Sequence, residues 1–214
     1  AQKHPRQLRR ALQSCRSQTF PNFEVIVVGH GDTGACEEAC KDFADHRFRC
    51  IETDESGAAA AWRIGSEEAR GRYAVLHDEH DLMVSTRLER HLAALWEGTI
   101  HGSYCGVIDF NDEDGSIAEL HPGKELSVPA TLTQAYTTFH RSLMVEASIF
   151  REFQHDDYRM SGIDCAILFA ASYQGLKLAH TGSFGLLRRH RNSIASRRPA
   201  IRHEPQDLQD EAVT

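Results

Sequence analysis

The segment His77–Asp81 reads His-Asp-Glu-His-Asp and places two imidazoles and three carboxylates next to one another. Buried ionisable groups at this density are costly unless partners compensate them. Carboxylates suit Mg²⁺ or Mn²⁺, and an imidazole among them moves the preference toward Mn²⁺. A solvated loop is the alternative. We favour a ligand site because the segment directly follows the apolar stretch Tyr73–Leu76.

The elements around this segment follow from the apolar periodicity. Tyr73–Leu76 and Val25–Val28 are predicted strands, and polar groups follow each of them, at His77–Asp81 and at Gly29–Asp32. In open α/β sheets, ligands bind outside the carboxyl ends of strands, so both tips are expected at one crevice. Helices are predicted near residues 8–15, 35–43, 58–69, 88–95 and 164–173. Further strands are predicted near 48–51, 104–110 and 178, with a hairpin turn at 111–115, and the stretch 184–191 follows the last of them.

Length and composition limit the domain organisation. The chain has 214 residues, of which 41% are hydrophobic, enough for one sizeable core. We predict a single domain over residues 1–199, with a nucleotide-binding half at about 1–105 and an acceptor half at about 106–199. Residues 200–214 are predicted to form a polar, disordered tail.

Charge and cysteine usage narrow the partners and the compartment. The formal net charge is −7, which argues against a nucleic-acid binder, although arginines gather at 188–202 and suit a phosphate-bearing small molecule. The six cysteines lack the spacing of a disulfide scaffold or of a Cys-x-x-Cys pair, which favours a reduced, cytoplasmic protein. No apolar run reaches the length of about 20 residues that spans a bilayer, so no transmembrane segment is expected.

Several phrases resemble family 2 glycosyltransferases of the GT-A fold. Gln18–Val28 reads QTFPNFEVIVV, which is similar to the opening of that family, and Ala69–Tyr73 matches its Ala-x-Gly-x-Tyr approach to an Asp-x-Asp strand. The resemblance spans about residues 5–196. It implies an α/β fold of Rossmann-like GT-A type, with a mostly parallel central sheet flanked by helices and a smaller acceptor-side lobe.

The resemblance implies a donor and metal site. Asp78–Asp81 stands where the family has Asp-x-Asp-Asp, so His80 replaces the second aspartate, and the ion held there is Mn²⁺ or Mg²⁺. Leu187–His190 resembles a late Tyr-Arg-x-His segment that faces the diphosphate and the metal. The implied metal ligands are Asp78, His80 and His190, and the implied donor-binding residues are Gly29, His30, Asp32, Gly57, Arg63, Asp78 and Arg188.

The same resemblance implies an inverting transferase. Asp164 stands where the family has its general base, at the start of a helix, although an ordinary helix N-cap explains an aspartate there equally well when it is taken alone. The implied donor is a nucleotide-diphosphate sugar, and the implied acceptor is a glycan, a lipid-linked molecule or a small molecule. Peripheral attachment at the inner membrane face and assembly as a homo-oligomer are compatible with this interpretation.

Departures from the family pattern keep two alternatives open. The usual first strand is not seen before Pro5, and Gly29, His30 and Gly34 replace the aspartates that hold the base and the ribose. One alternative is therefore a degenerate GT-A-like domain that binds without catalysis. The other is a metal-dependent hydrolase that uses the histidines and aspartates of His77–Asp81.

Overall fold

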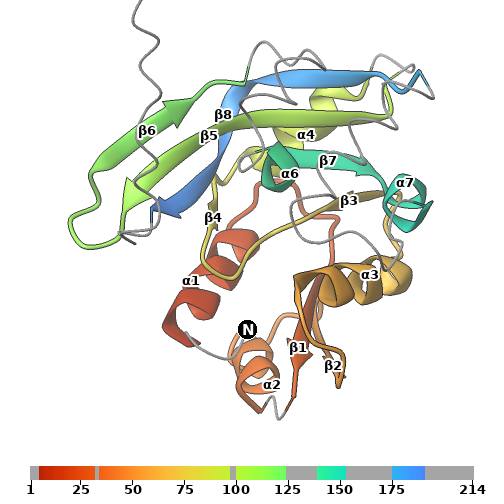
Figure 1. Ribbon diagram of the computed structural model, residues 1–214, viewed down its shortest axis with the longest axis vertical. Helices are drawn as coiled ribbons and strands as arrows, with labels where there is room; N and C mark the ends of the chain where they lie inside the picture. Colours follow the sequence, from red (N-terminus) through yellow and green to blue (C-terminus); the bar gives the residue numbers. More distant parts are fainter. Residues whose placement is uncertain (1–4, 32–33, 97–99, 124–138, 153–174, 191–214) are drawn as a thin grey trace, which may run out of the picture.

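The computed structural model describes residues 5–31, 34–96, 100–123, 139–152 and 175–190 (Figure 1). Helices and strands alternate along the chain. Their bounds are α1 Pro5–Arg16, β1 Val25–His30, α2 Gly34–Lys41, β2 Phe48–Thr53, α3 Ala58–Glu68, β3 Tyr73–Val75, β4 Leu82–Met83, α4 Arg87–Ala94, β5 Gly102–Asn111, β6 Ile117–His121, α6 Phe139–Ser142, β7 Leu143–Glu146, α7 Ala147–Glu152 and β8 Leu178–His190.

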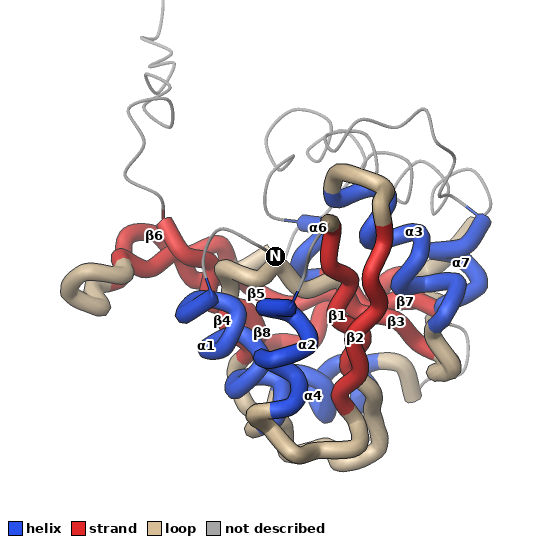
Figure 2. The backbone as a smooth tube through the Cα atoms, turned by 90° about the horizontal axis from the view of Figure 1, so that it is seen from below, coloured by secondary structure: helices blue, strands red, loops and turns tan. Residues whose placement is uncertain are grey.

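The strands form a two-stranded and a six-stranded sheet. β1 and β2 pair in parallel, while the larger sheet has the order β3-β7-β5-β8-β4, with β6 on β5 (Figures 1 and 2). β5 and β8 are also parallel, and the remaining pairs are antiparallel. The predicted α/β class is confirmed, but in the described residues the sheet is mixed rather than mostly parallel. The cause is the β5–β6 hairpin together with β4 and β7, short strands that no apolar periodicity predicted.

The predicted elements up to the hairpin are confirmed within a few residues. α1, α2, α3 and α4 lie where apolar spacing predicted helices, and β1, β2, β3 and β5 follow the predicted apolar strands. Asn111–Gly115 turns the chain between β5 and β6, and the Asn111 carbonyl accepts a bond from the Gly115 amide at 2.9 Å. The predicted helix at 164–173 and the predicted tail at 200–214 lie outside the described residues.

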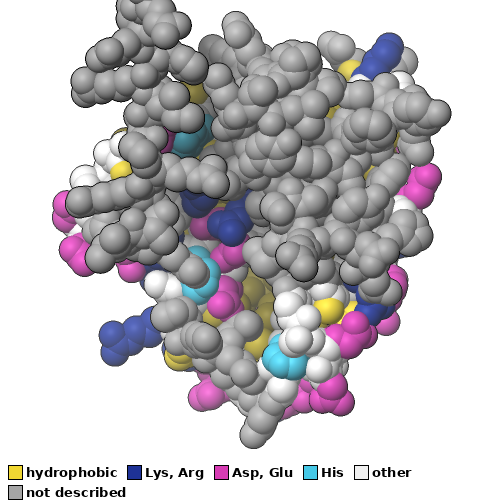
Figure 3. Space-filling model, viewed as in Figure 1, with side chains coloured by type: hydrophobic (Ala, Val, Ile, Leu, Met, Phe, Trp, Pro, Cys, Tyr) yellow, Lys and Arg dark blue, Asp and Glu magenta, His cyan; other side chains and the backbone are white. Residues whose placement is uncertain are grey.

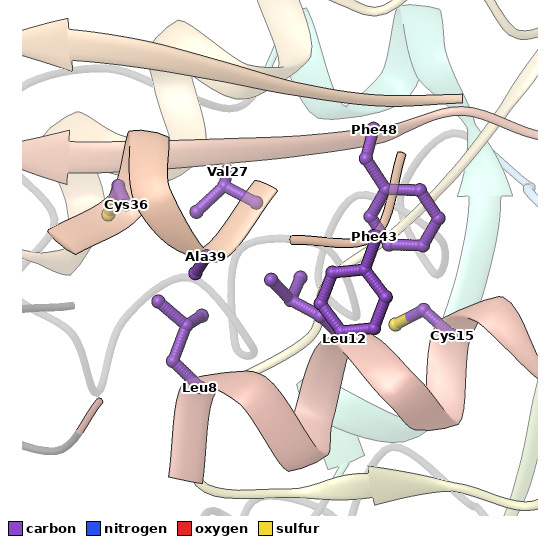
Figure 4. Packing of buried hydrophobic residues seen from close by; sticks show 8 residues of the cluster. All are labelled: Leu8, Leu12, Cys15, Val27, Cys36, Ala39, Phe43 and Phe48. Atoms are coloured by element: carbon purple, nitrogen blue, oxygen red, sulfur yellow. The ribbon is translucent and has the colours of Figure 1, made fainter. Parts of the chain in front are cut away.

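The N-terminal core forms between α1 and the β1–β2 pair. Leu8, Ala11, Leu12 and Cys15 recur at helical spacing and are all buried on one face of α1. They pack toward Val27, Cys36, Ala39 and the stacked rings of Phe43 and Phe48, whose centroids are 5.4 Å apart (Figure 4). This packing fixes α1 against the strands whose tips carry the candidate site.

The polar side of α1 then holds the segment that leads into β4 and α4. Ser14 Oγ accepts the amide of Met83 at 3.0 Å. Gln18 donates to the carbonyl of Val84 at 2.9 Å and accepts the amide of Leu88 at 3.1 Å, and its side chain is buried. These bonds satisfy backbone groups at the start of α4, which has no side-chain cap of its own. The segment after His77–Asp81 is thereby held on α1.

None of the helices in the described part of the chain is both long and apolar enough to cross a membrane.

Candidate functional site

The acidic and imidazole-rich segment forms a tight turn between β3 and β4. The Asp81 amide bonds to the Asp78 carbonyl at 3.1 Å, and the His80 amide bonds to Asp78 Oδ1 at 3.0 Å. An aspartate that accepts an amide two residues later is a common way of closing such a turn. The turn places the side chains of Asp78, His80 and Asp81 around one short piece of backbone.

The end of β8 lies directly against this turn. Leu82 and Met83 of β4 pair with Leu187 and Leu186 of β8. Beyond that pairing, Arg189 donates its amide to Asp81 Oδ1 at 3.3 Å and its Nε to the His80 carbonyl at 3.0 Å. The turn and the C-terminal end of β8 are therefore adjacent, as the resemblance implied.

His190, a predicted metal ligand, follows Arg189 at the end of β8. Its backbone pairs with Asn111 of β5, and its side chain lies outside the described part of the structure.

On the face shown in Figure 3, basic, acidic and imidazole side chains gather near the middle of the molecule.

Arg141 of α6 supplies positive charge to the turn. Its Nη2 lies 3.1 Å from Asp78 Oδ2, and its Nη1 lies 3.0 Å from Asp81 Oδ2. Burial acts to raise the pKa of Asp78, but Arg141 and the His80 amide outweigh it, so the pKa lies below its ordinary value. Burial raises the pKa of Asp81 despite Arg141, because only 1% of Asp81 is exposed. The two carboxylates of the turn thus differ in acidity.

The two imidazoles of the turn lie in different surroundings. Burial lowers the pKa of His77 to about 3, and the charge of Arg87 adds to this effect, so His77 is neutral at physiological pH. His80 Nδ1 lies 2.5 Å from Gln7 Oε1, an acceptor that requires the ring proton on Nδ1. His80 Nε2 lies 3.4 Å from Glu79 Oε1.

The ligand types at this turn suit a divalent ion, but its described side chains do not bring three ligand atoms within 4.8 Å of one another. Asp78 and Glu79 offer carboxylate oxygens and His80 offers an imidazole nitrogen, the ligand types that Mn²⁺ accepts. Asp78 is, however, already paired with Arg141 in the structure.

The tip of β1 holds two of the residues that the resemblance assigns to the donor. Gly29 and His30 end β1, where His30 is exposed, and the Gly31 amide bonds to the Thr53 carbonyl at 3.1 Å. Burial raises the pKa of the Cys36 thiol in α2, and the charge of Glu79 adds to this effect. Asp32 and the predicted base Asp164 lie outside the described residues.

Two further predicted donor residues lie around α3. Gly57 precedes the helix with a φ of 101°, a conformation that favours glycine. Arg63 is held in ion pairs, at 2.6 Å from Glu55 and 3.2 Å from Glu67. Glu55 and Glu67 therefore neutralise the guanidinium that the resemblance assigns to donor binding.

Arg188 and Arg189 lie on opposite faces of the sheet, because successive side chains of a strand alternate. Arg188 binds Asp109 through Nε at 2.7 Å and Nη2 at 2.5 Å, and these contacts lower the pKa of Asp109 against the effect of burial. Arg189 lies over the ring of Phe110 and forms an ion pair with Asp112. Arg189 therefore contacts the turn, whereas Arg188, the predicted donor residue, binds Asp109.

On the Arg188 face, Asp109 belongs to a second group of metal-ligating side chains. Ligand atoms of Asp109, Glu119 and His121 lie within 4.8 Å of one another, and this is the one such group of three within the described ranges. The Asp109 and Glu119 positions pair across β5 and β6, which accounts for their proximity. Both carboxylate oxygens of Asp109 are already bound by Arg188.

Sequence reasoning missed Arg141, Arg189 and Gln7 as residues of the turn. Strand alternation around Leu187–His190 signalled that one of the two arginines faces away from the site, but it did not say which. Arg141 and Gln7 carried no signal, because each reaches the turn from a distant part of the chain.

Comparisons with known proteins find relatives among glycosyltransferases. The curated relatives include the glycosyltransferase GlyA of Streptococcus pneumoniae, 32% identical over 50% of this chain and 16% of that protein. An uncharacterized glycosyltransferase of Haemophilus influenzae is 27% identical over 74% of this chain and 66% of its own length.

Among solved structures, S. aureus TarS 1-349 in complex with UDP-GlcNAc superposes with a TM-score of 0.64 at 12% identity, covering 87% of this chain and 55% of TarS 1-349. The similarity supports the GT-A fold, while the chain spans only about half the length of that structure. The family model described as "Glycosyl transferase family 2" matches residues 3–159, which is more than half of the chain. The chain belongs to glycosyl transferase family 2.

Proposed function

We propose that the chain transfers a sugar from a nucleotide-diphosphate donor to an acceptor hydroxyl, with inversion and with help from a divalent ion. The observation that carries the proposal is the contact between the turn at Asp78–Asp81 and the end of β8 at Arg189. It joins carboxylates, an imidazole and a guanidinium at one edge of the sheet. A leaving diphosphate needs such positive groups and a metal-binding carboxylate.

The residues divide the work as follows. Asp78 and His80, with His190, would hold Mn²⁺ or Mg²⁺, which supplies positive charge to the leaving diphosphate. Arg189 adds a guanidinium from the same side of the sheet. Asp164, by resemblance, takes the proton of the acceptor hydroxyl. Gly29, His30, Asp32 and Gly57 contact the nucleotide.

The donor class is chosen from the neighbour in fold. TarS 1-349 has been crystallised with UDP-GlcNAc and with UDP, so uridine diphosphate sugars are the first donors to test. We propose a glycan, lipid-linked or small-molecule acceptor, with transfer in the cytoplasm or at the inner face of the membrane.

The test is calorimetric titration of the purified chain with UDP-GlcNAc and Mn²⁺, extended to guanosine and thymidine diphosphate sugars. Asp78→Asn should weaken donor binding in the presence of Mn²⁺ by about tenfold or more, the loss expected for one strong charged contact. The matched control is Asp54→Asn, which alters an exposed aspartate in the same half of the chain. Equal donor affinity in Asp78→Asn and wild type would refute the proposed site.

A non-catalytic binding domain is the second candidate, and one observation favours it. Arg141 already neutralises Asp78 and Asp81, so the turn has a counter-ion without a metal. Donor binding without any sugar transfer would support this candidate. The hydrolase alternative loses support, because the family that matches the chain is glycosyl transferase family 2.

A further inference from the structure

One guanidinium bridges both aspartates of the turn. Each Nη atom of Arg141 contacts one carboxylate. Nη2 lies 3.1 Å from Asp78 Oδ2, and Nη1 lies 3.0 Å from Asp81 Oδ2. The side chains are largely shielded from solvent, with exposed fractions of 22% for Arg141, 23% for Asp78 and 1% for Asp81. Ion pairs that are partly removed from water are screened less than surface pairs.

The backbone of Arg141 is held by a second arginine, Arg87. Its carbonyl accepts a bond from Nη2 of Arg87, a residue that is only 1% exposed. Arg87 is in turn fixed by a bond from its Nε to His91 Nε2 at 3.4 Å, and His91 Nδ1 lies 2.8 Å from Ser103 Oγ. A chain of polar contacts thus runs from the buried face of α4 to the turn.

The two ends of the bridge are not equivalent. Asp81 is buried and also accepts the amide of Arg189, so its position is fixed by β8 as well as by Arg141. Asp78 is more exposed and is the carboxylate that the proposed function gives to the metal. Arg141 and a divalent ion would share Asp78 Oδ2, where like charges repel each other.

We propose that Arg141 is a positioning residue that serves as the resident cation of the metal-free turn, and that a divalent ion at Asp78 competes with it. The inference rests on the proposed function only in placing the ion at Asp78. When the ion binds, Arg141 gives up Asp78 and keeps Asp81. The affinity of the turn for metal is then set by how strongly Arg141 holds Asp78.

The experiment measures Mn²⁺ alone, by the electron paramagnetic resonance signal of the free ion. All variants carry His121→Ala, which removes one ligand of the second group at Asp109 and Glu119. Arg141→Gln should bind Mn²⁺ about tenfold more tightly, since it loses a close like charge. Arg141→Lys should tighten binding less, because an ammonium ion cannot bridge two carboxylates as a planar guanidinium does.

Two controls locate the effect. Arg72→Gln removes an arginine that pairs with Glu146 at 3.1 Å, and it should leave Mn²⁺ affinity unchanged. Asp78→Asn added to Arg141→Gln should abolish the gain. Unchanged or weaker Mn²⁺ binding in Arg141→Gln than in the His121→Ala reference would overturn the proposal, as would an absence of Mn²⁺ binding in both.

A second measurement keeps the wild-type chain, in case Arg141→Gln fails to fold. In the NMR spectrum, the Nε–H signal of Arg141 is assigned by its loss in Arg141→Lys. This signal should shift on titration with Mg²⁺. A signal that does not move would overturn the proposal. The sugar-transfer assay plays no part in either readout. A chain that shows the Arg141 effect but transfers no sugar refutes the proposed function alone.

Discussion

At the scale of single residues, the two neighbouring arginines of β8 have different roles. Arg188 neutralises the buried Asp109, whose side chain is 4% exposed, while Arg189 contacts the turn. Strand alternation forces this division, because one of two successive side chains must face away. We therefore favour Arg189 over Arg188 as the arginine that meets the donor.

Arg188→Gln should cost stability and leave donor binding intact. Removing one partner of a buried ion pair destabilises by about 3 to 5 kcal/mol, and partial exposure of Arg188 places the expected loss at about 3 kcal/mol. Denaturant unfolding measures the loss. Arg189→Gln should instead weaken UDP-GlcNAc binding by about tenfold. A donor affinity that falls in Arg188→Gln and stays constant in Arg189→Gln would restore Arg188 as the donor residue.

At the scale of elements, the close contact of β5 with β7 and β8 depends on a glycine. A Cβ added at Gly102 would lie 2.7 Å from Val145 Cγ1, 2.8 Å from Leu178 Cδ2 and 2.9 Å from the Met144 carbonyl. The last contact involves backbone, which cannot rotate away. Gly102 therefore allows β5 to approach both neighbouring strands.

Gly102→Ala should lower the free energy of unfolding by about 1 to 3 kcal/mol, the usual cost of overpacking. Gly34→Ala is the matched control, since a Cβ at Gly34 meets nothing within 4 Å. Thermal or denaturant unfolding compares the two variants. Equal stability of both would show that β5 and β7 separate more easily than the structure indicates.

His91 is a buried neutral histidine of α4 that contacts Ser103 of β5. Burial holds the pKa of His91 well below its ordinary value, and Arg87 adds to the shift. In the unfolded chain, His91 takes up a proton as the pH falls below about 6.5, whereas in the folded chain it stays neutral. The free energy of unfolding therefore decreases as the pH falls below about 6.5. His91→Gln, which does not titrate, should reduce the difference in unfolding free energy between pH 7 and pH 5. Parallel curves for variant and wild type would contradict this assignment.

At the scale of the whole molecule, the fold was more predictable than the site. Apolar spacing predicts helices such as Pro5–Arg16 because packing of one face dominates their stability. The strand Leu143–Glu146 was not predicted, since it is short and its residues are buried on both faces rather than alternating. The antiparallel pairs of the sheet come from that missed strand, from β4 and from the β5–β6 hairpin.

The site was predictable where neighbours in sequence make it and unpredictable where distant segments do. Asp78 and His80 were proposed as site residues because ligating groups are dense around them in the sequence. Gln7 and Arg141 reach the same turn across 73 and 60 residues, to His80 and Asp81, and no local pattern marks them. Long-range ion pairs of this kind become visible only when the chain is folded.

The most direct test of the account is a crystal structure of the chain with Mn²⁺ and UDP-GlcNAc, with the ion located by its anomalous scattering. We predict an anomalous peak at Asp78, with the diphosphate between the turn and the end of β8 near Arg189. A peak at Asp109, Glu119 and His121 with the diphosphate on that face, or a nucleotide bound away from Asp78, would contradict it.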